Sequence, residues 1–350
     1  MHNSSSSLET VIKSTARVVG HSTAPVIVVG LPRSGSSYLA HVLSCLDDWF
    51  VFDDLYPYQK AAALGISTSS NLAENQQLLE KLINSLTWQL RAKIKFEENF
   101  YIPELSLEDT FDMERSLLQA LNTNPLTWSQ VLEEWMMRLA RHCGKHRWGY
   151  KTPQDFMHMD ELTDTFPGVK FIYILRDPRK MMRSFKGLPR VKTHGSQDGE
   201  SRQYHPVVYS LYWKKAYEKV QDFIQRGRAP VEVVKFEDLV KTPEAVADRL
   251  AAFLDTQVCG QVALDKRNSS FKGSSSKELT QTEMMICERI AGSCMRSAGY
   301  ELHHPRPNGL DIIDLLNTSA IFTTYQVQRL VTDKRARASI LTFLQSLLGK

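Results

Sequence analysis

The sequence has few of the features that mark secreted, zinc-binding or membrane proteins. Its five cysteines form no C-x-x-C pair and show no zinc-ligand spacing. Because they are odd in number and lie in apolar helical contexts, we expect reduced, buried thiols. No apolar run approaches the ~20 residues that a helix needs to cross a bilayer. Residues 4–7 are all serine, and no apolar segment of a secretory signal follows them. We therefore expect a soluble, cytoplasmic protein without a membrane span.

The chain also lacks a strong excess of charge. Its 43 Lys and Arg residues against 39 Asp and Glu residues give a net charge of +4, which is too small to indicate a nucleic-acid surface. An anionic cofactor bound at one place is compatible with this charge. There are no internal repeats, and 350 residues suffice for one large core with an appended subdomain.

Residues 24–46 have the pattern of a strand that enters a helix through a tight loop. Residues 26–29 are a continuous β-branched run of the kind found in buried parallel strands. Residues 30–35 form the loop, and residues 36–46 are expected to be a helix with small hydroxyl residues in its first turn. Such a loop directs unpaired backbone N–H groups at one point, with the positive helix end behind them. The segment therefore predicts a phosphate-binding site.

The loop matches the P-loop pattern G-x-x-x-x-G-K-[ST] except at one position. Gly30 and Gly35 have the required spacing and Ser37 occupies the Ser/Thr position, but Ser36 replaces the lysine. The positive charge lies within the loop instead, as Arg33. The pattern still favours a phosphate-bearing nucleotide, whereas transfer of a γ-phosphate is less favoured. The alternative is a tight strand-to-helix turn that binds nothing.

The rest of the chain alternates between apolar strands and helices. Four further short apolar runs bounded by turn residues are expected to be strands, at residues 49–52, 148–151, 169–175 and 231–236. Apolar residues recur at helical spacing through residues 55–147, which indicates an α-helical insertion. Thr152 and Thr242 each precede a proline and are expected to cap the helices that follow. The pattern predicts an α/β fold with a P-loop-like parallel sheet of about five strands flanked by helices.

Two of these elements carry motifs that resemble a known enzyme family. Residues 32–37, Pro-Arg-Ser-Gly-Ser-Ser, look like the 5′-phosphosulfate-binding loop of sulfotransferases that use 3′-phosphoadenosine 5′-phosphosulfate (PAPS), in the branch with Arg-Ser-Gly-[Ser/Thr]. Arg176 at a strand end and Ser184 eight positions later resemble the family's 3′-phosphate motif. A guanidinium fork and a hydroxyl donor suit a dianionic phosphate. An Arg-Asp-Pro at a strand end can also be a structural ion pair.

Other segments extend the resemblance over much of the chain. Residues 151–153, Lys-Thr-Pro, resemble a segment of one branch, and residues 236–239, Phe-Glu-Asp-Leu, resemble a structural turn of the family. Gly299-Tyr300 resembles its C-terminal pattern. We therefore expect three regions, namely a lead-in at 1–23, a sulfotransferase-like α/β domain at 24–302 with the insertion inside it, and a helical C-terminal extension at 303–350.

The resemblance implies transfer of a sulfuryl group from PAPS to a hydroxyl acceptor by in-line displacement, with adenosine 3′,5′-bisphosphate as product. The residues that it places at the donor are Arg33, Ser34, Gly35, Ser36, Ser37 and Tyr38 in the loop, and Arg176 and Ser184 at the 3′-phosphate. In the basic, serine-rich stretch 265–277, Phe271 is expected to cover the adenine, with Ser270 and Lys272 beside the 3′-phosphate. A polar loop without a ligand is the alternative.

The catalytic residues are less directly indicated. Lys151 is expected to reach the bridging oxygen and stabilise the departing bisphosphate, unless it is an ordinary surface lysine. Pro153 occupies the position of the cytosolic branch's catalytic histidine. Other branches place a glutamate where this sequence has Asp54, with Asp53 beside it, so we expect a carboxylate base. These two residues could instead cap the next segment.

Two other functions stay open at this point. An atypical P-loop kinase or NTPase would need Mg²⁺ ligands and the lysine that Ser36 replaces, and we expect no metal site. A non-catalytic nucleotide-binding protein would keep the fold and lose the chemistry, as the proline at position 153 allows. The sequence does not indicate the oligomeric state. It also leaves the acceptor open among a sugar, a lipid, a tyrosine, a small metabolite and a carrier-bound hydroxyl.

Overall fold

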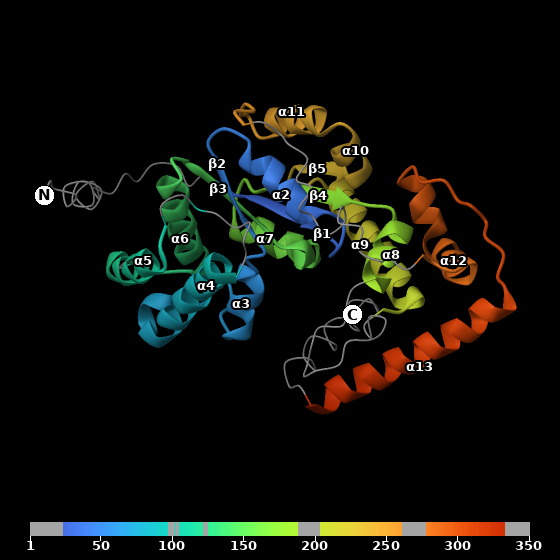
Figure 1. Cartoon of the computed structure of the whole chain (residues 1–350). Coiled ribbons are helices and arrows are strands. Elements are labelled where there is room, and N and C mark those ends of the chain that lie inside the picture. Colours follow the sequence, from blue (N-terminus) through green and yellow to red (C-terminus); the bar gives the residue numbers. More distant parts are fainter. Residues whose placement is uncertain are drawn as a thin grey trace, which may run out of the picture.

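A parallel sheet of five strands forms the centre of the protein. The computed structural model describes residues 24–96, 102, 105–121, 125–187, 204–260 and 278–332. The strands are β1 (Val26–Gly30), β2 (Trp49–Asp53), β3 (Arg147–Lys151), β4 (Lys170–Leu175) and β5 (Val231–Lys235). They lie in the order β2-β3-β1-β4-β5 (Figure 1). The predicted fold class is confirmed, and each strand is within one residue of its predicted bounds.

Apolar side chains cover both faces of the sheet. Val26 and Val28 of β1 belong to one buried cluster, whereas Ile27 and Val29 belong to the other. Successive side chains of a strand point to opposite faces, so a strand buried on both faces is apolar throughout. Helix α2 (Ser36–Ser44) packs on the first face together with α11 (Pro243–Phe253). Because β1 is the middle strand of the sheet, the loop after it lies at the centre of the carboxyl edge.

The chain between β2 and β3 forms the α-helical insertion that the sequence predicts. Its elements are α3 (Pro57–Ala63), a 3₁₀ turn (Leu72–Glu74), α4 (Gln76–Phe96), α5 (Leu107–Ala120) and α6 (Trp128–His142). Capping boxes that start at Ser106 and Thr127 begin α5 and α6. The ring of Trp135 on α6 lies 5.5 Å from that of Phe52 on β2, which anchors the insertion to this edge of the sheet.

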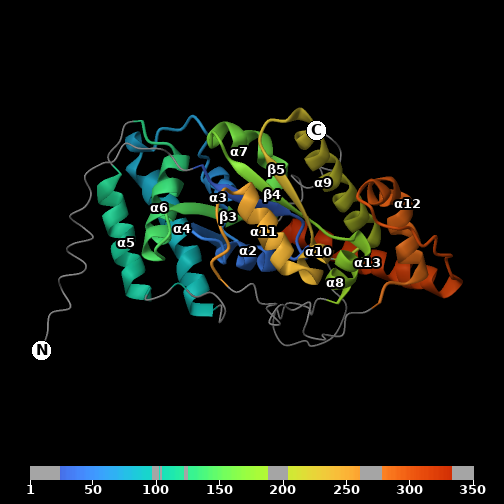
Figure 2. The same cartoon turned by 90° about the horizontal axis from the view of Figure 1, so that it is seen from above.

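The remaining helices follow the other strands. They are a 3₁₀ helix η2 (Pro153–His158), α7 (Met159–Thr165), α8 (Pro178–Lys186), α9 (Pro206–Arg226), α10 (Phe236–Lys241), α11 (Pro243–Phe253), α12 (Gln281–Ser297) and α13 (Gly309–Thr332). Helix α12 packs along α9. Both views place α12 at the end of the molecule opposite to the insertion, and Figure 1 shows α13 running from that end toward the middle (Figures 1 and 2). None of the helices in the described ranges combines the length and apolar character needed to span a membrane.

Two predicted helix starts are confirmed in position but not in their capping bonds. Thr152 and Thr242 are the N-cap residues of η2 and α11, each followed by a proline at the start of the helix. Thr152 Oγ1 instead accepts a hydrogen bond from the N–H of Tyr56 at 3.0 Å, and Thr242 Oγ1 donates to the carbonyl oxygen of Asp238 at 3.2 Å. One prediction is wrong, because Phe236, expected to end β5, begins α10.

The thiols are less buried than expected. All five cysteines are free, but Cys259 is exposed, and Cys45 and Cys143 are half-buried. Only Cys287 and Cys294 lie in the core. The apolar helical stretches around the cysteines therefore did not determine whether each thiol is buried.

Candidate active site

The loop between β1 and α2 leads into a helix that no side chain caps. Ser34 closes the loop, because its N–H and its Oγ both donate to the carbonyl oxygen of Leu31, at 3.1 and 2.6 Å. Gly35 occupies the N-cap position with φ of 94°, and α2 has no side-chain cap. The first-turn N–H groups therefore lie beside the loop at the positive end of the helix dipole. This arrangement suits an anionic ligand.

The hydroxyl and aromatic residues of the first turn differ in their exposure. Ser36 is buried and Ser37 is exposed at the end of the loop. The ring of Tyr38 belongs to the buried cluster of β1 and α2. Tyr38 therefore contributes its backbone, not its ring, to this end of the helix.

Arg33 connects the two predicted phosphate motifs. Arg176 donates from Nη1 to the carbonyl oxygen of Arg33 at 2.8 Å, and Arg33 donates from Nε to Ser184 Oγ at 3.0 Å. These partners are 143 and 151 positions apart in the chain. They meet because β4 lies directly beside β1, so the loops after both strands share one edge. Burial lowers the pKa of both guanidinium groups, and the charge of Arg33 lowers that of Arg176 further.

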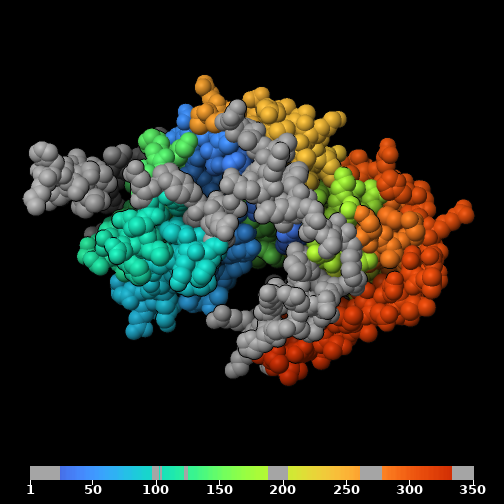
Figure 3. Space-filling view, in the orientation of Figure 1, coloured from blue at the N-terminus to red at the C-terminus, as the bar shows by residue number. Residues whose placement is uncertain are grey.

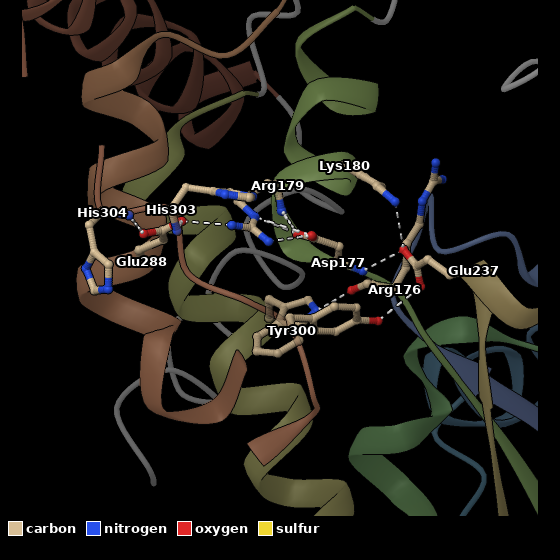
Figure 4. A network of polar contacts seen from close by, with 10 residues as sticks. Arg176, Asp177, Arg179, Lys180, Glu237, Glu288, Tyr300, His303 and His304 are labelled. Carbon is tan, nitrogen blue, oxygen red and sulfur yellow. Dashed lines mark hydrogen bonds and ion pairs between the residues drawn. The ribbon is translucent and has the colours of Figure 1, made fainter. Parts of the chain in front are cut away.

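Arg176 keeps hydrogen-bonding capacity that the protein does not use. Its guanidinium lies 4.1 Å from the centre of the Phe236 ring. Its Nε is buried and has no hydrogen-bond partner among the described residues. Asp177 forms its ion pair with Arg179 at 2.8 Å, and Arg179 also pairs with Glu288 (Figure 4). Asp177 of the Arg-Asp-Pro segment does form a structural ion pair. Its partner is Arg179, which follows the segment, and not Arg176.

Lys151 lies within a cluster of side chains from three neighbouring elements. Its Nζ is 2.7 Å from Asp53 Oδ1 and 2.5 Å from Asp54 Oδ1, and it donates to Ser37 Oγ at 3.3 Å. Lys151 is only 2% exposed, so it is not an ordinary surface lysine. β2 pairs with β3 in register, with Asp53 opposite Lys151, which brings the predicted base and the predicted leaving-group cation together.

The turn after β2 holds Asp54 in a fixed position. Asp54 and Tyr56 both have left-handed backbone angles, with φ of 56° and 57°. The hydroxyl of Tyr56 donates to Asp54 Oδ1 at 3.2 Å, and burial raises the pKa of this phenol, which keeps its proton. Tyr56 is the N-cap of α3 and makes no side-chain cap. The alternative that Asp53 or Asp54 caps this helix is therefore wrong.

Comparison with known proteins identifies the family. Residues 25–259, more than half of the chain, match the family model described as the sulfotransferase family. The chain belongs to the sulfotransferase family. Sulfuryl transfer is therefore the class of reaction that this enzyme catalyses. The match includes the loop of residues 30–35, Lys151, Arg176 and Ser184.

Several solved structures are similar to this sulfotransferase at low sequence identity. The sulfotransferase domain of the olefin synthase from Synechococcus PCC 7002 is 17% identical, with a TM-score of 0.45 over 86% of this chain and 97% of that one. A sulfotransferase domain from the curacin biosynthetic pathway is also 17% identical, with a TM-score of 0.46 over 81% and 100%. Sulfotransferase STF9 from Mycobacterium avium is 13% identical, with a TM-score of 0.41 over 84% and 82%. Comparison with curated proteins finds no match.

Gly35 of this sulfotransferase has two separate structural requirements. Its φ of 94° is a conformation that L side chains rarely adopt, and an added Cβ would lie 2.1 Å from the Phe236 ring. We expect Gly35→Ala to lower the free energy of unfolding by about 3 kcal/mol, measured by urea denaturation. Gly227→Ala is the matched control, because Gly227 has φ of 62° but open space around it, and should cost about 1 kcal/mol. Equal losses in the two variants would contradict the role of Phe236.

A buried carboxyl group near the site was not found from the sequence. Asp155 on η2 is fully buried and accepts a hydrogen bond from Gln59 Nε2 of α3 at 2.6 Å. This bond joins η2, which follows Lys151, to α3, which follows Asp54. Burial raises the pKa of Asp155 to about 7, although the hydrogen bond from Gln59 lowers it. In the sequence, an aspartate three residues after Thr152 is typical of an exposed first helical turn, which concealed this role.

Asp155 should make the stability of the protein depend on pH. Between pH ~4 and ~7 this carboxyl ionises in the unfolded chain but keeps its proton in the folded one, so the free energy of unfolding falls as pH rises, by up to about 4 kcal/mol. Asp155→Asn should remove this contribution. Urea denaturation across this range should show the variant gaining stability relative to wild type as pH rises. Asp112→Asn, at an exposed site, is the control and should not gain stability relative to wild type as pH rises. Parallel curves for Asp155→Asn and wild type would contradict the assignment.

The described residues do not include every predicted site residue. Ser270, Phe271 and Lys272 lie outside them. No cluster of three or more His, Cys, Asp or Glu side chains that could hold a metal ion occurs within the described part of the chain.

Proposed function

We propose that this enzyme transfers a sulfuryl group from PAPS to a hydroxyl acceptor, with a carboxylate as general base. The observation that supports the proposal most strongly is the contact of Arg33 with both Arg176 and Ser184. This contact places the start of α2, which suits an anion, beside Arg176 as a second cationic group. The two meet because β1 and β4 are adjacent strands. A donor with phosphates at two positions of one ribose requires two anchors a short distance apart. We also propose that residues 24–302 form the catalytic domain and residues 303–350 an extension.

The charge of the two anchors fits this donor. Arg33 and Arg176 are both partly buried and repel each other, since the charge of Arg33 lowers the pKa of Arg176. A bound bisphosphate would offset this repulsion and would supply an acceptor for the unpartnered Nε of Arg176. Ser184 would donate its hydroxyl proton to the same phosphate. The N–H groups at the start of α2, with Ser36 and Ser37, would hold the 5′-phosphate.

Lys151 and Asp54 would carry the chemical step. The donor supplies an electrophilic sulfuryl group attached to a phosphate leaving group. Lys151 lies against Ser37 of the phosphate loop, so its ammonium is placed to stabilise the negative charge that develops on the bridging oxygen. When Lys151 turns toward that oxygen, its contact with Asp54 weakens. Asp54 is then able to take the proton of the acceptor hydroxyl as the new oxygen–sulfur bond forms and the old one breaks.

Arg176→Lys should weaken the binding of adenosine 3′,5′-bisphosphate by about 30-fold, because lysine keeps the charge but loses the planar fork that spans Arg33 and the phosphate. Isothermal titration calorimetry measures this change. Arg249→Lys is the matched control. Arg249 on α11 pairs with Glu232 on β5, away from the loop between β1 and α2. A change of less than about threefold in Arg176→Lys would contradict its role as a 3′-phosphate anchor.

The acceptor class is tested by sulfur transfer. Purified enzyme is incubated with ³⁵S-labelled PAPS and a panel of simple alcohols, phenols, sugars and amines, and labelled products are separated by chromatography. The proposal expects label on hydroxyl compounds, with release of adenosine 3′,5′-bisphosphate in equal amount. Label confined to amines would overturn the hydroxyl assignment, and no label on any acceptor with intact PAPS would count against PAPS as donor.

A further inference from the structure

The ring of Phe236 lies between the two groups that are proposed to hold the phosphates of the donor. Strands β4 and β5 pair with Leu175 opposite Lys235, so the next residues, Arg176 and Phe236, leave the sheet side by side. The guanidinium carbon of Arg176 lies over the ring, 4.1 Å from its centre. Gly35, the N-cap of α2, has no room for a Cβ because of the same ring. One buried aromatic side chain therefore contacts both loops.

A ring in this position limits how the fork of Arg176 can turn. Arginine stacks its flat guanidinium on an aromatic face, and its N–H groups then point outward in the plane of the fork. Nη1 donates in this way to the carbonyl oxygen of Arg33 at 2.8 Å. Nε of the same fork has no hydrogen-bond partner among the described residues. An aliphatic side chain at position 236 would fill the space beside Arg176 without setting this plane.

The other contacts of Arg176 hold its main chain and its charge. Its carbonyl oxygen accepts a hydrogen bond from Trp213 Nε1 of α9 at 2.9 Å. Burial lowers the pKa of the Arg176 guanidinium, and the negative charge of Glu237 raises it. Glu237 itself accepts a hydrogen bond from the hydroxyl of Tyr300 at 3.2 Å (Figure 4). Phe236 is the contact that covers the face of the guanidinium.

The start of α10, which carries Phe236, is also fixed against α8. Lys180 Nζ of α8 lies 3.6 Å from Glu237 Oε1, and the N–H of Asp177 donates to the same oxygen at 3.4 Å. In the space-filling view, the gold surface of α10 and α11 adjoins the yellow-green surface of α8 (Figure 3). Helix α8 carries Ser184, the other side chain proposed to hold the 3′-phosphate. Phe236 therefore belongs to a frame around this part of the site.

We propose that Phe236 is a positioning residue that orients Arg176 toward the 3′-phosphate of the donor, so that the enzyme selects nucleotides that carry this phosphate. This role rests on the proposed function, in which Arg176 anchors that group. The 5′-phosphate depends less on the ring, because its N–H donors belong to α2 and Ser34 closes the loop before them through two bonds to Leu31. Loss of the ring should therefore weaken the binding of a 3′,5′-bisphosphate more than that of a 5′-monophosphate.

Calorimetric titration with adenosine 3′,5′-bisphosphate and with adenosine 5′-monophosphate tests this role and needs no acceptor. Phe236→Leu should bind the bisphosphate about 20-fold more weakly, and the monophosphate within about threefold of wild type. Phe236→Tyr, which keeps the ring, should bind the bisphosphate within about threefold of wild type. Phe111→Leu is the matched control, since the Phe111 ring lies 3.7 Å from the guanidinium carbon of Arg91 in the insertion, and it should change neither affinity.

A double-mutant cycle shows whether Phe236 acts through Arg176. In an Arg176→Lys background, Phe236→Leu should weaken bisphosphate binding by less than about threefold, because an ammonium has no plane for the ring to orient. Losses of about 20-fold in both backgrounds, or equal losses for both nucleotides, would overturn the proposal, since the ring would then act on the fold and not on Arg176. If circular dichroism shows Phe236→Leu to be unfolded, Phe236→Met gives the same comparison with the same expected split.

The same titrations separate this role from the proposed function. Arg176→Lys alone should weaken bisphosphate binding by about 30-fold. A loss in Arg176→Lys with none in Phe236→Leu would overturn the role of Phe236 and leave Arg176 as the anchor. Wild-type bisphosphate affinity in Arg176→Lys would instead overturn the 3′-phosphate anchor itself, and the role of Phe236 with it.

Discussion

Lys151→Met is expected to lower kcat by about 10³-fold with the best hydroxyl acceptor, because the variant leaves the charge on the bridging oxygen without its cation. Methionine retains the length and apolar stem of lysine, which suits a residue that is 2% exposed. Affinity for adenosine 3′,5′-bisphosphate should change by less than about tenfold, since the proposed anchors Arg33 and Arg176 are unchanged in this variant. Steady-state kinetics and calorimetry on the same preparation give both quantities.

The control for Lys151→Met is a lysine that also projects from a strand into an ion pair. Lys170 at the start of β4 pairs with Asp255 at 2.8 Å, at the opposite edge of the sheet. Lys170→Met should leave kcat unchanged within about twofold. Because Lys151→Met also leaves Asp53 and Asp54 without their counterion, circular dichroism must show that the variant is folded. A folded Lys151→Met with wild-type kcat would remove Lys151 from the mechanism.

Asp54→Asn is expected to lower kcat by about 10²–10³-fold, because an amide cannot accept the acceptor's proton. The neighbouring carboxylate provides a matched comparison, since Asp53 also contacts Lys151 but receives no hydrogen bond from Tyr56. Asp53→Asn should lower kcat by less than about tenfold. Both variants should bind adenosine 3′,5′-bisphosphate as wild type does. A larger loss in Asp53→Asn than in Asp54→Asn would exchange the two roles.

The sequence was sufficient for the sheet and for the position of the loop between β1 and α2. β1 is buried on both faces, so its β-branched run indicated a parallel strand, and the glycines at 30 and 35 bounded the loop. The spacing of Arg176 and Ser184, which follow β4 and lie on α8 respectively, is set within one strand–helix unit. The order of strands and helices along the chain was therefore predictable, whereas capping bonds and the burial of single thiols were not.

Contacts between distant segments were not predictable. The ion pairs of Lys151 with Asp53 and Asp54 depend on the register of β2 with β3, which nothing in either segment specifies. The burial of Asp155 depends on Gln59, which lies 96 residues earlier. The strand order β2-β3-β1-β4-β5, which brings these groups to one edge, is likewise specified by no single segment.

The most direct test of the proposed site is a pair of calorimetric titrations of wild-type enzyme, one with adenosine 3′,5′-bisphosphate and one with ATP and Mg²⁺. The two ligands share the adenine and differ in where they carry phosphate. The site of Arg33, Arg176 and Ser184 should bind the bisphosphate at least about tenfold more tightly than ATP with Mg²⁺. Tighter binding of ATP with Mg²⁺, unaffected by Arg176→Lys, would contradict the PAPS site and favour a kinase-like nucleotide.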